Sequence, residues 1–192
     1  MSETEPSTSV RWALQAARCA GDVANYCDHA EHNEATEREW VLHAARSLRS
    51  LACEIAVCHG VDLQERYAAR LRAVEERNPL CSEESPDGAL LALEARTWRD
   101  LQLVQATHDR HYHPDVLGLS KLGQLHHYAL HLSKLAGATA ALAEGTCDVD
   151  DFRARRLPDM LVFGIKLSTV VGQSLPETQL GKHSSDRVLT VA

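Results

Sequence analysis

The sequence predicts an all-α protein, a helical bundle of six or seven helices, and three observations support this class. Apolar residues recur at helical spacing in successive segments. Of the residues, 44% are apolar and only 5% are aromatic, a composition typical of helices packed through Leu, Ala and Val. Ten Gly and six Pro are too few for a strand-and-turn protein of 192 residues, and no stretch of useful length alternates polar and apolar residues.

The first half of the chain, 9–77, follows a tail at 1–8 that is expected to be disordered, and it should form three helices. The first covers 9–30, where small and apolar residues recur at helical spacing (Leu14, Ala17, Gly21, Ala24). A clearer apolar stripe runs from Val41 to Ile55, and its helix should stop at Gly60. Asp62 then caps a third helix, with one apolar face (Leu63, Tyr67, Leu71, Val74).

A polar, acidic segment with two prolines, "NPLCSEESPDG" at 78–88, is the predicted linker between the two halves. Ser85 and Pro86 suit the N-cap and first position of one long helix. That helix should end at His113, because a residue before proline avoids the helical backbone conformation. One face of it carries five apolar residues followed by two histidines (Leu90, Ala95, Trp98, Leu101, Val104, His108, His111).

Two further helices complete the second half, 89–177. Ser120 begins a helix that runs to Glu144. After a turn in "EGTCDVDD", Pro158 begins the last helix, and Gly172 lies just past its end. We expect 9–177 to form a single helical domain, followed by a C-terminal tail at 178–192.

Charge and cysteine usage exclude several classes of protein. The net charge of −7 argues against a nucleic-acid partner. No stretch approaches the ~20 apolar residues needed to span a bilayer, and "MSETEPSTS" at the start has no apolar signal core. The six cysteines include no CxxC pair. We therefore expect a cytoplasmic protein with reduced cysteines and no membrane partner.

A faint internal repeat relates the two halves. Aligning Gly60 with Gly172 places "CEIAVCHGVDLQER" over "IKLSTVVGQSLPET", and in both segments a helix ends in Gly before a short polar step to Leu and Glu. "RWALQ" and "TWRDLQ" mark corresponding starts. Since Ala-rich helices that end in Gly are common, the sequence leaves open whether the halves arose by duplication.

The apolar helix that ends in "GVDLQE", followed by a helix with "RLRAVEER", resembles the closing part of MazG-like proteins, which are all-α nucleoside triphosphate pyrophosphohydrolases. "DMLVFGIKLSTVVGQSLPE" resembles the same part again, and "HLSKLAGAT" falls where the family has its first acidic motif. The resemblance covers most of the chain and depends on helix pattern. It implies a homodimer and a Mg²⁺ site built from an ExxE pair and an ExxD pair.

Most carboxylates of this implied magnesium site are missing. The four positions hold His131, Lys134, Arg156 and Asp159 in the second half. In the first half they hold Cys19, Asp22, Ala44 and Ser47. Since one carboxylate per half cannot build the usual magnesium cage, ordinary pyrophosphohydrolase activity is not expected.

The resemblance then implies a protein that binds a nucleotide or a related phosphorylated small molecule. The expected cleft lies between the helix at 120–144 and the helix at 158–171. Four polar residues are the predicted contacts to the ligand (Lys134, Arg155, Arg156, Asp159). Neither a glycine-rich phosphate loop nor a Ser–His–Asp order stands out in the sequence.

Histidines supply a second hypothesis, because six of the chain's eleven lie between His108 and His131. His108 and His111 are three residues apart, and His127 and His131 are four apart, so each pair shares a helix face. Imidazole favours Zn²⁺, Fe²⁺ or Ni²⁺ over Mg²⁺. The predicted ligand set combines these two pairs with one carboxylate (His108, His111, His127, His131, Asp159).

The opposing interpretation is that these histidines are half-buried polar residues at helix ends, hydrogen-bonded to carbonyl groups. Three functions therefore stay open: binding of a phosphorylated small molecule, a transition-metal enzyme, or a non-catalytic helical interaction protein. The sequence does not decide whether the protein is an enzyme, nor which cofactor it uses.

Overall fold

The computed structural model describes residues 7–79 and 87–180, and it confirms the all-α class. Six helices in these ranges have 14 residues or more. The elements in chain order are α1 (Thr8–Glu31), α2 (Arg38–Cys58), α3 (Leu63–Arg77), α4 (Gly88–Glu94), α5 (Trp98–Tyr112), α6 (Pro114–Leu117), α7 (Lys121–Glu144), α8 (Val149–Asp151), a π turn (Phe152–Arg156) and α9 (Leu157–Val170).

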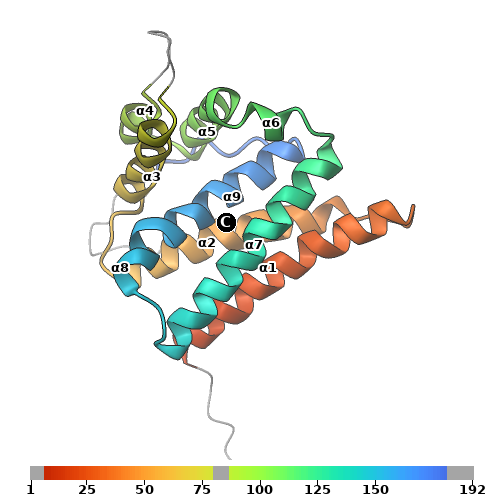
Figure 1. Cartoon of the computed structure of the whole chain (residues 1–192), viewed down its shortest axis with the longest axis horizontal. Helices are drawn as coiled ribbons and strands as arrows, with labels where there is room; N and C mark the ends of the chain where they lie inside the picture. The colour runs from red at the N-terminus through yellow and green to blue at the C-terminus, as the bar shows by residue number, and fades with distance from the viewer. Residues whose placement is uncertain (1–6, 80–86, 181–192) are drawn as a thin grey trace, which may run out of the picture.

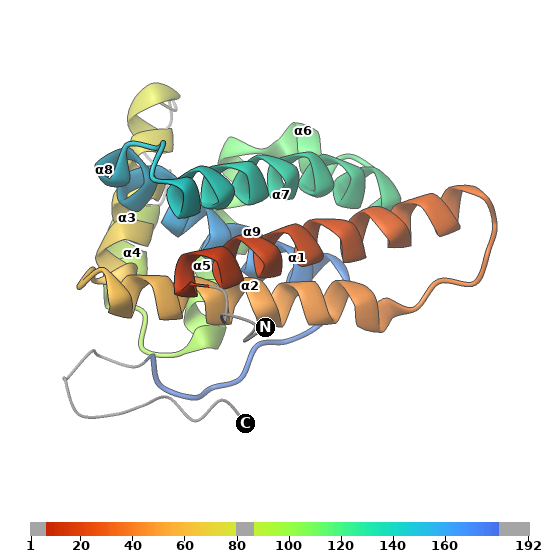
Figure 2. The same ribbon diagram turned by 90° about the horizontal axis from the view of Figure 1, so that it is seen from below.

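Helix α9 lies at the centre of the molecule. It packs against α2, α3, α5 and α7, while α1 packs against α2 and α7 (Figures 1 and 2). Figure 2 shows α9 between α7 and α2, with α1 alongside both. Every residue from Met160 to Ser168 is buried, which explains why this helix is apolar all round rather than on one face.

Several helix ends match the residues that the sequence provides for them. The side chains of Ser7, Asp62 and Ser120 accept hydrogen bonds from backbone N–H groups at the starts of α1, α3 and α7. Gly60 and Gly172 have φ angles of 62° and 72°, in the left-handed region where glycine is favoured. The two glycines aligned in the internal repeat thus end their helices with the same backbone conformation.

The prediction of a single long helix between the linker and His113 is wrong. The structure has two helices there, α4 and α5, because Ala95 leaves the helical conformation with φ −56° and ψ 134°. Thr97 then caps α5, and its side chain and that of Asp100 bond each other's backbone N–H groups. This capping box outweighs the apolar periodicity that continues across the break. The predicted caps Ser85 and Pro86 lie outside the described residues, and Asp87 caps α4.

The last helix begins earlier than Pro158. Asp148 caps α8, and helical backbone continues through the π turn into α9. Proline within a helix lacks an N–H and clashes with the carbonyl four residues before it. The π turn accommodates this, since the N–H of Leu157 bonds the carbonyl of Phe152, five residues earlier.

The chain after α9 runs back along the start of α5. Backbone N–H groups of Trp98 and Arg99 donate to the carbonyls of Thr178 and Pro176, and that of Leu180 donates to Arg96. Order therefore extends at least to Leu180, beyond the expected boundary at 177. The side chain of Gln102 also accepts from the N–H of Leu175, which holds this segment against α5.

Among the described residues, five cysteines are free thiols (Cys19, Cys27, Cys53, Cys58, Cys147), as expected, and Cys81 lies outside them. In the same ranges, no helix combines the length and the hydropathy needed to cross a membrane.

Helices α2 and α9 are in close contact at Gly164. A Cβ atom at this position would lie 2.7 Å from Cγ of Arg49 and 3.1 Å from the carbonyl oxygen of Ala45. Arg49 also donates from Nη1 to the Gly164 carbonyl (3.1 Å) and to the Ser168 hydroxyl (2.7 Å). The contact thus depends on the absence of a side chain at 164.

We expect Gly164→Ala to destabilise the protein by about 1–3 kcal/mol, because the added methyl group overpacks this contact. Gly137→Ala on α7 is the matched control: nothing lies within 4 Å of its added Cβ. Helix propensity alone then predicts a gain in stability of up to about 1 kcal/mol. Urea unfolding measures both changes, and an equal effect at the two positions would contradict the close approach.

Candidate functional site

A network of buried polar side chains connects α3, α5 and α9. Lys166 of α9 donates to the carboxylate oxygen Oδ1 of Asp109 over 2.9 Å, and Gln105 donates to the same oxygen over 2.8 Å. The hydroxyl of Tyr67 donates to the side-chain oxygen of Gln105 over 2.9 Å. Gln105 and Asp109 share a face of α5 because they are four residues apart. The side chains of the Lys166–Asp109 pair are only 9% and 7% exposed.

His108 lies next to this network and is almost completely buried. The residue is 2% exposed, the Leu71 backbone and the Glu75 carboxylate lie beside the ring, and neither ring nitrogen has a partner in good hydrogen-bond geometry among the described residues. Its ring stacks on Tyr112 with centroids 4.5 Å apart. Burial lowers the pKa of His108 to about 4, so the ring is neutral at pH 7.

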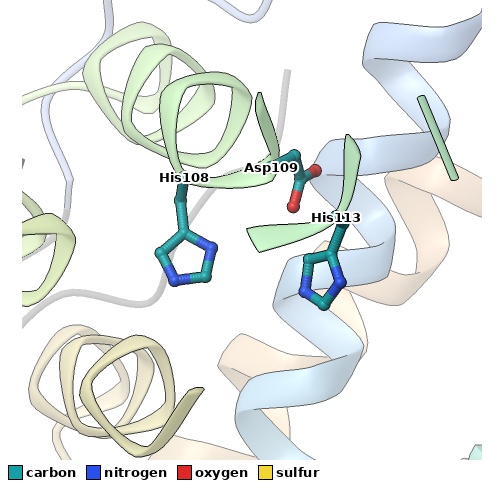
Figure 3. A group of neighbouring side chains, drawn as sticks. All are labelled: His108, Asp109 and His113. Carbon is teal, nitrogen blue, oxygen red and sulfur yellow. The ribbon is translucent and has the colours of Figure 1, made fainter. Parts of the chain in front are cut away.

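His113 brings a second imidazole to the same place. It ends α5 just before Pro114, where the helix must stop, and Figure 3 shows its ring below the Asp109 carboxylate, with one ring nitrogen on the side of His108. Burial, followed by the positive charge of Lys166, lowers the pKa of His113. One ligand atom each from His108, Asp109 and His113 lies within 4.8 Å of the others, so these three residues form a candidate metal-binding group.

His127 and His131 pair on α7, as their spacing predicts. Their ring centroids are 4.8 Å apart, and the ring of His131 stacks on Phe163 of α9 at 4.7 Å. Burial lowers the pKa of both, that of His131 to about 4. After burial, the nearby positive charges of His127 and Lys134, and then of Lys166 and His113, also lower the pKa of His131.

A cavity of about 390 Å³ opens beside the network, between α5, α6, α7 and α9. Its walls include three cationic side chains, Arg110, Lys121 and Lys166, and one acidic side chain, Asp109. Uncharged polar groups and a tyrosine complete the polar part of the wall (Gln105, Gln124, Tyr128, Thr169). This cavity lies beside the two helices, α7 and α9, between which the sequence predicts the ligand cleft. Its lining residues differ from the four predicted ligand contacts.

The predicted phosphate contacts lie outside this cavity, and two of them are paired with other side chains. Asp159 accepts from Arg70 of α3 over 2.6 Å, and Arg155 pairs with Asp151 on its own helix. Lys134 is exposed on α7, and Arg156 ends the π turn half-buried. None of these four residues lines the cavity between α5, α7 and α9.

The predicted metal ligands do not all belong to one group in the structure. His108 belongs to the buried group with Asp109 and His113, whereas Nδ1 of His111 lies 2.9 Å from the Thr107 carbonyl. Asp109 and His113 were not predicted as ligands from the sequence. Their signal was present, because "HDRHYHP" places both within five residues of His108, but it lay outside the three- and four-residue spacings on which the prediction depended.

A second constellation lies between α1 and α2. Nδ1 of His43 is 2.9 Å from Oδ2 of Asp22, and Nε2 of His43 is 3.5 Å from Oγ of Ser47, beside a cavity of about 300 Å³. The structure thus places the side chains of Asp22, His43 and Ser47 next to one another, in an arrangement that the sequence alone did not indicate. Ser47 lies inside α2, where the backbone N–H groups are used by the helix, so the backbone around Ser47 offers no oxyanion donor for acyl transfer.

No family model, curated protein or solved structure matches the chain. The geometry around Lys166 and Asp109 permits two kinds of chemistry. The cationic cavity can hold an anion, and the neutral imidazoles with a carboxylate can hold a transition-metal ion.

We expect Lys166→Met to destabilise the protein by about 3–5 kcal/mol, because it leaves the Asp109 carboxylate buried without its cation. The double variant Lys166→Met/Asp109→Asn removes both charges and should recover part of this loss. Chemical unfolding of the three proteins measures the coupling. If the single variant kept wild-type stability, the buried ion pair would be contradicted.

Stability should fall as the pH drops from 6.5, the ordinary pKa of histidine, toward about 4, the pKa of folded His131. In this window the unfolded chain binds a proton at His131 that the folded protein does not bind. His108, His113 and His127 shift in the same direction. His131→Gln should therefore make the melting temperature less steeply dependent on pH.

Proposed function

We propose that the protein binds a small phosphorylated molecule in the cavity between α5, α7 and α9. The observation that carries this proposal is the gathering of Arg110, Lys121 and Lys166 around one cavity, in a chain whose net charge is −7. With Asp109 as the single acidic lining residue, the wall has a net charge of +2. Such a concentration of positive charge attracts an anion against the field of the whole molecule.

The lining also fits the shape and hydrogen bonding of a phosphoryl group. Arg110 offers a planar fork of donors, and Lys121 offers a compact ammonium group. Within the described ranges, neither side chain has a carboxylate within 4.0 Å, so both can serve a ligand. The amide of Gln124 donates to the carbonyls of Leu117 and Leu119, and the hydroxyl of Thr169 donates to that of Ile165, so the cationic side chains are the donors left for a ligand. A volume of about 390 Å³ suits a small molecule rather than a macromolecule.

MazG-like ancestry is part of the proposal. It depends on the sequence resemblance; the helices are compatible with the internal repeat within that resemblance, because α1 packs against α2 as α7 packs against α9, and α1 and α7 each have 24 residues. The positions implied for magnesium are mostly not carboxylates, and Asp159 is paired with Arg70. The proposed function is therefore ligand binding without the ordinary magnesium-dependent hydrolysis. Homodimer formation stays a prediction of the resemblance.

A thermal-shift titration with inorganic pyrophosphate and with a nucleoside triphosphate tests the binding. A ligand at 100 times its dissociation constant adds about 2.7 kcal/mol of stability. For a chain of this size that corresponds to a rise in melting temperature of about 5–11 °C. Arg110→Gln and Lys121→Gln should each weaken binding by about tenfold or more, since a charge-assisted hydrogen bond contributes ~1.5–3 kcal/mol.

Lys134→Gln and Arg155→Gln are the matched controls, because each removes one positive charge from the surface outside the cavity. They should keep wild-type affinity. Loss of binding in the controls but not in Arg110→Gln would move the site to the helix ends predicted from the sequence. The absence of any shift with either ligand would refute phosphate binding.

A further inference from the structure

We propose that His108, Asp109 and His113 bind a single transition-metal ion of the Zn²⁺ or Fe²⁺ class beside the cavity. Two nitrogen ligands and one carboxylate oxygen form a donor set that such ions prefer over Mg²⁺. This site differs from the ligand set predicted from the sequence in every member except His108. It also stands independently of phosphate binding, because metal alone can occupy it.

The buried ring of His108 carries the proposal. A polar group without a partner in the interior loses the hydrogen bonds it would make to water, and native structures rarely tolerate this without a reason. Neither ring nitrogen of His108 makes a hydrogen bond of normal length at 2% exposure, and Oε1 of Glu75 is 3.7 Å from Nε2. In Figure 3 one nitrogen of His108 lies on the side that faces His113, with the Asp109 carboxylate between the two rings. A metal ion there would give that nitrogen its missing partner.

Glu75 lies where the outer partner of a metal-bound histidine is expected. Its Oε1 atom is 3.7 Å from Nε2 of His108, which leaves Nδ1 for the metal. Histidine ligands commonly donate their second N–H to a carboxylate, which fixes the tautomer and orients the ring. The N–H of Gly88 donates to the same Oε1 over 3.0 Å. A Cβ at 88 would lie 2.7 Å from Oε1 and 3.0 Å from Cδ2 of His108, so glycine keeps the pair together.

Asp109 can bind a metal without giving up its contacts to the protein. Its Oδ1 atom accepts from Lys166 and Gln105, and Oδ2 has no such bond among the described residues. A carboxylate held through one oxygen is oriented to bind a metal through the other. The Lys166 ammonium repels a second cation, so we expect weaker binding than at a four-cysteine structural zinc site.

The geometry requires the site to close around the ion. Metal–ligand bonds of about 2.0–2.2 Å at a tetrahedral angle place ligand atoms about 3.3–3.6 Å apart, so the present separations of up to 4.8 Å must shorten by about 1 Å. His113 can supply this movement because it ends α5 and is only half-buried. Three protein ligands leave further coordination positions open, which is typical of sites that bind water or a substrate rather than purely structural sites.

Titration of the untagged full chain with Zn²⁺ against a chromogenic chelator, in buffer without phosphate, tests this site. We expect one ion per chain. His113→Gln should lower the affinity by about 100-fold or more, because it removes a ligand. Glu75→Gln should lower it by about tenfold, the lower range for an outer partner. His111→Gln, on the same helix but hydrogen-bonded to Thr107, should keep wild-type affinity.

Co²⁺ provides a readout that does not depend on the folding of any variant. The wild-type protein should bind one Co²⁺ and show visible absorption bands of a nitrogen-coordinated ion, which Zn²⁺ abolishes by displacement. The proposal is overturned if wild type binds neither metal, if His113→Gln retains its affinity, or if His111→Gln loses as much as His113→Gln. None of these outcomes bears on pyrophosphate binding, which is measured without metal.

Discussion

The buried ion pair between Lys166 and Asp109 is the interaction on which the rest of the site depends. It joins the central helix α9 to α5, and Gln105 and Tyr67 extend it to α3. A lysine that is 8% exposed needs a charged partner, because desolvation of a lone ammonium is very costly. Once Asp109 is fixed in this way, His108 and His113, on either side of it in sequence, are held beside the cavity.

Helix α9 is the central helix of the fold, and it also carries buried polar side chains. Its buried surface requires apolar residues on every side, yet it also carries Lys166 and Ser168 into the interior. Ser168 is satisfied by Arg49 of α2, and Lys166 by Asp109 of α5. Each buried polar group of α9 thus fixes a neighbouring helix, and the close approach at Gly164 fixes the distance to α2. The cavity lies on the side of α9 that faces α5, α6 and α7.

The all-α class and most helix boundaries could be predicted from sequence, because caps such as Asp62, Ser120 and Gly60 act through local geometry. The break before α5 could have been predicted from the Thr97–Asp100 capping box, but apolar periodicity hid it. Contacts between helices that are distant in the chain could not be predicted from the sequence. Arg70 lies 89 residues from Asp159, and nothing local indicates that it pairs with this carboxylate. The candidate site depends on such contacts, so only His108 of its metal group was predicted.

Tungstate, a heavy analogue of phosphate, gives the most direct test of whether the Lys166–Asp109 region is a ligand site. Crystals of the wild-type protein soaked in tungstate should show an anomalous peak within the cavity, in contact with Arg110, Lys121 or Lys166. A peak at Lys134 or Arg156 instead, or a cavity that stays without a peak while tungstate binds elsewhere, would contradict the assignment of function to this part of the fold.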